Sequence, residues 1–164
     1  GELRTVRDLI DGRNGVDTLS QVERLKFTDV TLAFDTAQGE NAGGVYRLYT
    51  AAFGRTPDQH GLGYWLDRVD HGMGLEAVAS AFIASPELVA TYGANLSDAK
   101  FINLLYEHAL NRAPDEAGAA YWMNALSHGQ SRGAVLASFS ESAEGFAQSL
   151  PLVANGIHYL EWTG

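Results

Sequence analysis

The spacing of apolar residues along the chain changes near residue 44. Before that point, short apolar runs stand between clusters of turn-forming residues, which is the pattern of short β-strands. After it, apolar residues recur every three to four positions, beginning at Val45, Leu48 and Tyr49, which is the pattern of helices buried along one stripe. The sequence therefore predicts a mainly α protein. We expect a small β-rich unit in residues 1–40 and a helical domain in residues 44–164.

The helical part contains one pattern twice. Residues 45–89 align without a gap with residues 102–146 at an offset of 57, and sixteen of the forty-five paired positions are identical. The identical residues are mostly apolar anchors and turn residues. Two copies with unequal ends predict a pseudo-two-fold bundle of two tandem helical repeats, because common helical solenoids have shorter repeats of about 33 to 47 residues.

Each copy is predicted to contain four helices. Pro57 and Asp58 are expected in the first turn of the second helix. There the N–H that proline lacks would have no hydrogen-bond partner in the helix, and the charge of aspartate is stabilised by the positive end of the helix dipole. Thr56 and Gln59 offer a capping box at the same place. Ser85 is expected to cap the fourth helix of the first copy, Ser142 the equivalent helix of the second copy, and Ser97 the helix that starts the second copy. The last stretch, residues 152–162, is expected to pack back as a final helix or strand.

Composition limits the classes of function. The chain has 164 residues, no cysteine, a formal net charge of -9 and only two lysines. This acidity opposes the basic surface that binding to a phosphate backbone requires, so we expect no nucleic-acid partner. No apolar run approaches the roughly 20 residues of a membrane-spanning helix, so we expect no membrane span.

The repeated motif resembles a known family. It reads Leu48-Tyr49-x-x-Ala52-x-x-Arg55-x-Pro57-Asp58-x-x-Gly61-x-x-Tyr64-Trp65 and returns as Leu105-Tyr106-x-x-Ala109-x-x-Arg112-x-Pro114-Asp115-x-x-Gly118-x-x-Tyr121-Trp122. Over roughly residues 44 to 150 the chain is similar to the bacterial family called domain of unknown function 4214. Members of that family typically form the tails of exported proteins, beside hemolysin-type calcium-binding repeats, adhesin-like regions, S-layer proteins or secreted hydrolases.

The resemblance implies a secreted or cell-surface protein and a domain without assigned activity. The ending Asn155-Gly156-Ile157-x-Tyr159 is similar to the C-termini of such chains. The resemblance therefore also implies export by a type I system, which reads an uncleaved C-terminal signal.

A calcium site is one candidate for chemistry in the N-terminal unit. Residues 12–19 resemble a hemolysin-type nonapeptide, and the oxygen donors on this glycine turn are Asp11, Asn14 and Asp17. Calcium needs six to eight oxygen ligands, and residues 21–26 supply no second turn. Two interpretations stay open, a tight hairpin with solvated aspartates, which we favour, and a weak calcium site. No other cofactor is expected.

The repeated arginine and aspartate, together with aromatic faces, form a second candidate site. The candidate ligand-binding residues are Arg55, Asp58, Tyr64, Arg112, Asp115, Tyr121 and Trp162. An arginine with stacking aromatic rings suits a small anion or a glycan. The favoured alternative is that Arg55 pairs within its own turn and that the repeated residues only define the fold.

Two further patterns have simpler explanations than a site. His71 and His128 stand at matching helix ends, where a favourable cation at the helix C-terminus explains them better than a metal shared across the pseudo-two-fold. Residues 129–133 spell the Gly-x-Ser-x-Gly of a nucleophile elbow around Ser131, but that motif needs a preceding strand, and here a helix is expected to end at Gly129. The sequence predicts a helix-to-helix turn.

The leading hypothesis is therefore a non-catalytic C-terminal module of an exported bacterial surface or secreted protein. It would serve export, surface attachment or protein–protein contact, and we expect no enzyme. The alternative is a carbohydrate-binding module that uses exposed aromatic residues to hold a cell-surface glycan. The sequence leaves the partner and the oligomeric state open.

Overall fold

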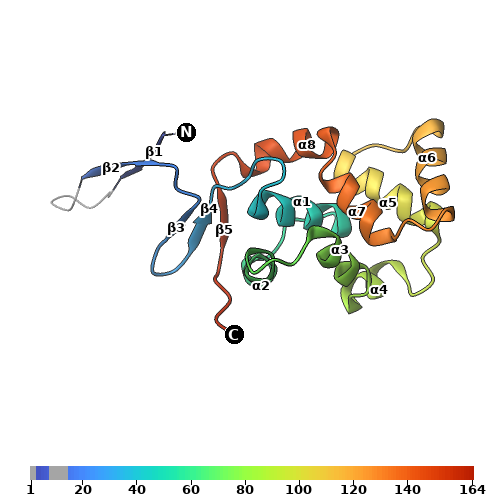
Figure 1. The fold of residues 1–164 in the computed structure, drawn as a ribbon, viewed down its shortest axis with the longest axis horizontal. Coiled ribbons are helices and arrows are strands. Elements are labelled where there is room, and N and C mark those ends of the chain that lie inside the picture. The colour runs from blue at the N-terminus through green and yellow to red at the C-terminus, as the bar shows by residue number, and fades with distance from the viewer. Residues whose placement is uncertain (1–2, 8–14) are drawn as a thin grey trace.

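The computed structural model describes residues 3–7 and 15–164 (Figure 1). In chain order the elements are β1 (Leu3–Arg7), β2 (Val16–Ser20), β3 (Arg24–Lys26), β4 (Thr31–Ala33), α1 (Asn41–Phe53), α2 (Gln59–Asp70), α3 (Leu75–Ile83), α4 (Pro86–Tyr92), α5 (Asp98–Leu110), α6 (Glu116–Ser127), α7 (Arg132–Ser140), α8 (Ala143–Val153) and β5 (Ile157–Tyr159). The prediction of a mainly α protein with a small β-rich N-terminal unit is confirmed. The strands gather at one end of the molecule, and α6 lies at the other (Figure 1).

The helices repeat with the offset that the sequence predicts. Both ends of α5, α6 and α7 lie 57 residues after the ends of α1, α2 and α3, and α8 begins 57 residues after α4. At the centre, α1 packs against α5 and α3 packs against α7, as a pseudo-two-fold arrangement requires. The fourth helices differ, because α8 packs against α5, α1 and α7, whereas α4 packs mainly against α3. The two copies therefore share a symmetric centre and have unequal surroundings.

The helix starts follow from capping side chains. Asp58 is the N-cap of α2 and accepts a hydrogen bond from the Gly61 N–H at 2.7 Å. The expectation that Pro57 and Asp58 occupy the first turn is thus wrong by one to two residues, and no Thr56–Gln59 capping box forms. The physical reason is that the aspartate oxygen satisfies a backbone N–H that would otherwise lack a partner.

The other predicted caps agree with the structure. The side chains of Ser85, Ser97 and Ser142 each accept a hydrogen bond at the start of their helices. Asp115 caps α6 as Asp58 caps α2, with a distance of 2.8 Å to the Gly118 nitrogen. Local capping rules therefore place the helix starts in both copies.

One aromatic cluster in each copy anchors the core. In the first copy, Tyr49 and Trp65 both meet Phe82 edge-on, at centroid distances of 5.2 and 5.1 Å. In the second copy the equivalent rings are Tyr106, Trp122 and Phe139, at 5.0 and 4.8 Å. The phenylalanines and tyrosines are buried, whereas both tryptophans are partly buried against the core. The repeated aromatic residues therefore have equivalent places in the fold.

The N-terminal and C-terminal sides of the chain share a sheet. β1 pairs with β2, whereas β3, β4 and β5 form a second antiparallel sheet with β4 in the middle. Thr31 lies opposite Tyr159 and Ala33 lies opposite Ile157. Residues 157–159 thus form a strand after the end of α8. Of the two structures expected for the last stretch, a helix or a strand, the strand is observed there. The predicted domain boundary at residues 40–44 stays a prediction. One sheet contains strands from both sides of it, because β3 and β4 precede the boundary and β5 follows it.

A buried aspartate joins this sheet to the helices. Asp35 follows β4 and accepts a hydrogen bond from the Ala42 N–H at 2.9 Å, at the start of α1. Arg24 of β3 pairs with Asp35 and also approaches Asp70 of α2 at 3.4 Å. Burial raises the pKa of Asp35, although the hydrogen bond from Ala42 and the charge of Arg24 oppose the rise. These ties hold α2 beside the sheet.

Candidate functional site

The repeated arginines bridge two helix starts in each copy. Arg55 precedes α2, and its Nη2 donates to Glu87 Oε1 at 2.6 Å, in the first turn of α4, and to the Tyr49 hydroxyl at 2.9 Å. We expected Arg55 to pair within its own turn, and this is wrong for its main partner, which is Glu87. Within the turn, Arg55 donates only to the Thr56 carbonyl, at 3.1 Å. The carboxylate offers the stronger, charge-assisted hydrogen bond.

The second copy makes the same bridge. Arg112 donates from Nε to Glu144 Oε1 at 2.7 Å and from Nη2 to Oε2 at 2.9 Å, while its guanidinium lies 4.8 Å from the Tyr106 ring centre. The hydrogen bond from Arg112 lowers the pKa of Glu144, and the Gly118 N–H lowers the pKa of Asp115. All of these charged groups already have internal partners. Whether they also bind a ligand stays a prediction.

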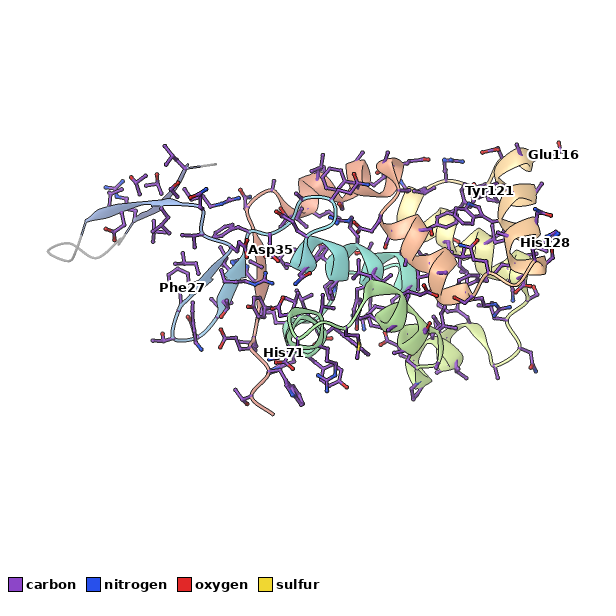
Figure 2. The ribbon with its side chains drawn as sticks, viewed as in Figure 1. Phe27, Asp35, His71, Glu116, Tyr121 and His128 are labelled. Carbon is purple, nitrogen blue, oxygen red and sulfur yellow. The ribbon has the colours of Figure 1, made fainter. Side chains whose placement is uncertain are left out.

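The candidate aromatic residues are not brought together as one site. Tyr64 of α2 meets Trp162 edge-on at 5.0 Å, and the Arg68 guanidinium lies 3.3 Å from the Tyr64 ring centre. Tyr121 is 64% exposed on α6, where its ring neighbour is Trp122 at 4.9 Å. Figure 2 shows Tyr121 at the end of the molecule that also carries Glu116. Tyr64 and Trp162 thus form a cluster in which Tyr121 takes no part.

The reason for this difference is a C-terminal cover over α2. The Leu160 N–H donates to the Gln59 carbonyl at 3.1 Å, and the Leu160 carbonyl lies so close to Gly63 that an added Cβ would come within 1.7 Å of it. The second copy has Ala120 in the place of Gly63, and α6 buries none of its residues. Equivalent helices therefore have unequal surfaces, one covered and one open.

A hollow of about 210 Å³ lies between α2 and the C-terminal segment, which we define as residues 157–164. It is lined by Gly63, Leu66, Asp67, Asp70, His71, Tyr159, Glu161 and Trp162. Of these residues, only Trp162 was predicted from the sequence to contact a ligand. The spacing of Asp67, Asp70 and His71 was the available signal, because positions i, i+3 and i+4 share one helix face.

A larger hollow of about 450 Å³ lies where the C-terminal ends of α1 and α5 meet α8. His108 lines it, and Nε2 of that ring lies 3.3 Å from the Tyr92 hydroxyl. In the part of the chain that the structure describes, His108 Nδ1 is the buried side-chain nitrogen without a hydrogen-bond partner. This nitrogen is sealed from solvent, so it offers no contact to a ligand in the hollow.

The metal-site predictions have different outcomes. Asp11 and Asn14 lie outside the described residues, and Asp17 lies exposed on β2. Residues 3–7 and 15–164 contain no group of three or more histidine, cysteine, aspartate or glutamate side chains arranged to hold a metal ion. The calcium site around residues 11–17 stays a prediction.

The two simpler explanations agree with the structure. His71 Nδ1 lies 2.6 Å from the Asp67 carbonyl and His128 Nδ1 lies 2.8 Å from the Asn124 carbonyl, each at the end of its own helix. Figure 2 shows the two histidines far apart, His71 beside α2 near the middle of the molecule and His128 at the end formed by α6, so they share no metal. Ser131 caps α7 and accepts from the Ala134 N–H at 3.0 Å, in a helix-to-helix turn as predicted.

Comparison with known protein families gives a match in the helical repeats. The model of the family described as Domain of unknown function (DUF4214) matches residues 79–149, from within α3 to within α8. The resemblance noted over residues 44 to 150 is thus supported for its later part. No curated protein and no solved structure matches the chain. Among the described residues, none of the helices has the length and apolar character needed to cross a membrane.

Proposed function

From the match of residues 79–149 to the model of the family described as Domain of unknown function (DUF4214), we propose that the chain is a non-catalytic module of an exported bacterial surface or secreted protein. The module serves protein contact, and through it export or surface attachment.

The observation that carries the proposal is the open outer face of α6. Tyr121 is 64% exposed and Met123 is 39% exposed on this helix. At the equivalent positions of α2, Tyr64 is half-buried and Leu66 is buried beside the C-terminal segment. Tyr121 and Met123 lie two positions apart and so point to different sides of α6, which is therefore uncovered on more than one side. Exposed apolar side chains on an uncovered helix favour contact with another protein.

The second copy also limits what kind of protein surface fits this face. On α2, the backbone of Leu160 approaches the helix because Gly63 has no side chain. Ala120 stands at that position on α6, so an extended chain cannot approach in the same way. The partner therefore meets α6 through side chains and not through a backbone that lies directly on the helix.

The first experiment deletes residues 45–164 from the parent protein and measures its export and its retention at the cell surface. We expect loss of one or both. Unchanged export together with unchanged retention would contradict the proposed role.

A second experiment tests the α6 face in the full-length parent. The double variant Tyr121→Ser with Met123→Ser removes the exposed apolar groups of α6 without touching the core. The matched control is Met73→Ser with Val89→Ser, two apolar residues that are 37% and 40% exposed elsewhere. We expect retention or export to fall in the α6 variant only. Equal behaviour of the two variants would refute a contact role for α6.

A further inference from the structure

The hollow between α2 and the C-terminal segment combines an aromatic ring with hydrogen-bonding groups. Its volume of about 210 Å³ equals that of roughly seven water molecules at ~30 Å³ each, which is room for one sugar ring. We propose that this hollow binds a neutral, hydroxyl-rich ligand, namely a single sugar residue of a glycan. Sugar binding here does not depend on the proposed protein contact at α6.

The aromatic face is fixed before any ligand arrives. Trp162 is 47% exposed, yet its ring stands perpendicular to Tyr64 at 5.0 Å, and the Arg68 guanidinium lies 5.9 Å from its centre. Arg68 in turn stacks on Tyr64. Such aromatic and cation–π contacts hold the ring in place, so little side-chain entropy is lost on binding. A fixed and exposed indole offers an apolar face to the C–H groups of a sugar.

The charges around the hollow decide between ligand classes. Asp67 lies 3.8 Å from Arg68, Asp70 lies 3.4 Å from Arg24, and Glu161 pairs with Lys26. The hydrogen bond from Lys26 lowers the pKa of Glu161, which therefore stays ionised at neutral pH. Each carboxylate of the hollow thus has a cation beside it, although Arg24 is shared between Asp70 and the buried Asp35.

This pairing of carboxylates with cations favours a neutral ligand. A metal ion or an amine gains less where each carboxylate already has a cation beside it, and an anion meets the negative oxygens. Hydroxyl groups can still donate to the remaining lone pairs, and hydrogen bonds to ionised groups are about twice as strong as neutral ones. Lining the same hollow, His71 has its Nδ1 beside the Asp67 carbonyl. Its Nε2 is then available to a sugar hydroxyl.

The second copy lacks the same set of groups. Asn124 replaces Asp67, Ser127 replaces Asp70, and Ala120 replaces Gly63. No segment of the described chain covers α6 as residues 157–164 cover α2, since α6 buries none of its residues. We therefore expect one binding site per chain, and the second copy supplies matched control positions.

The test is a titration of the isotope-labelled full chain with methyl hexosides and methyl N-acetylhexosaminides, followed by backbone amide shifts. We expect shifts at residues 63–71 and 159–162. Asp67→Asn copies the residue that the second copy uses, so the helix tolerates it. Loss of one hydrogen bond to a charged group should weaken binding by about tenfold or more. Trp162→Ala should abolish binding, whereas the exposed control Tyr121→Ala should leave it unchanged.

Three results of the sugar titration would overturn the inference. They are no shift with any sugar of the panel, shifts centred on α6, and binding that survives both Asp67→Asn and Trp162→Ala. Stronger binding of calcium or methylammonium than of any sugar at this hollow would also overturn it, because the cations beside the carboxylates disfavour a further cation. The α6 double variant should bind sugars normally, so failure of the protein-contact proposal remains distinguishable.

Discussion

The substitution Gly63→Ala changes the stability of the protein through two effects of opposite sign. Alanine is favoured over glycine inside a helix by about 1 kcal/mol, so helix propensity alone predicts a more stable protein. The structure predicts the reverse. The new Cβ would lie 1.7 Å from the Leu160 carbonyl oxygen, whereas ordinary contacts begin at 3.4 Å. A backbone carbonyl cannot rotate away as a flexible side chain can, so residues 157–164 must move outward.

The cost of that movement can be estimated from the interactions around Gly63. Overpacking costs about 1 to 3 kcal/mol, and this backbone clash falls at the upper end. That cost includes the hydrogen bond from Leu160 to the Gln59 carbonyl, worth about 1 kcal/mol, which breaks when the segment moves. Subtracting the gain in helix propensity leaves a net destabilisation of about 2 kcal/mol. For a chain of this length the melting temperature should fall by about 4 to 8 °C.

The assay is urea unfolding followed by far-UV circular dichroism and tryptophan fluorescence. The matched control is Ala120→Gly on the open helix, which should lose about 1 kcal/mol through helix propensity alone. If Gly63→Ala stabilises the protein by about 1 kcal/mol, the C-terminal cover does not press on α2. The inferred difference between the surfaces of α2 and α6 would then be refuted.

Three other predictions concern separate features. Trp122→Ala should destabilise the protein by about 3 kcal/mol, the lower end for a large aromatic residue because Trp122 is only partly buried, and a change below about 1 kcal/mol in urea unfolding would refute its core role. The lowered pKa of Glu161 means that its pair with Lys26 stabilises the fold above the ordinary glutamate pKa and ceases to do so as pH falls through the lowered value. Glu161→Gln should therefore reduce the acid-induced loss of stability below pH ~4.5, and an unchanged pH profile would contradict this. Calcium should bind weakly, at about 0.1 to 1 mM, with amide shifts confined to residues 8–20, and shifts in the helical repeats would contradict this.

Features that depend on local rules were predictable from the sequence. Apolar spacing predicted the helices of the first copy, because it shows which face of a helix is buried. The repeat offset of 57 residues then predicted where each helix of the second copy begins. Ser85, Ser97 and Ser142 were recognisable as N-caps because a serine oxygen accepts a hydrogen bond from a free backbone N–H at a helix start. The error at Pro57 and Asp58 arose because the pair fits two different helix starts. Proline is common at the first helical position, which would start the helix at Pro57, and aspartate is common at the N-cap, which starts it after Asp58.

Features that depend on distant segments were not predictable. The pairing of Arg55 with Glu87 joins residues 32 positions apart, so no helix or turn periodicity relates them. Their joint repetition as Arg112 and Glu144 was the one available signal. The hollow beside α2 likewise needs Trp162 to reach back over a helix formed about a hundred residues earlier.

Native-state hydrogen exchange tests most directly the central claim that one duplicated scaffold carries one covered and one open helix. Exchange rates of backbone amides report how readily each helix opens. We expect slower exchange for α2 than for α6, with Leu66 protected more strongly than Met123. Removal of residues 155–164 should bring the two helices to similar rates. Equal protection in the intact chain, or a difference that survives the removal, would contradict the claim.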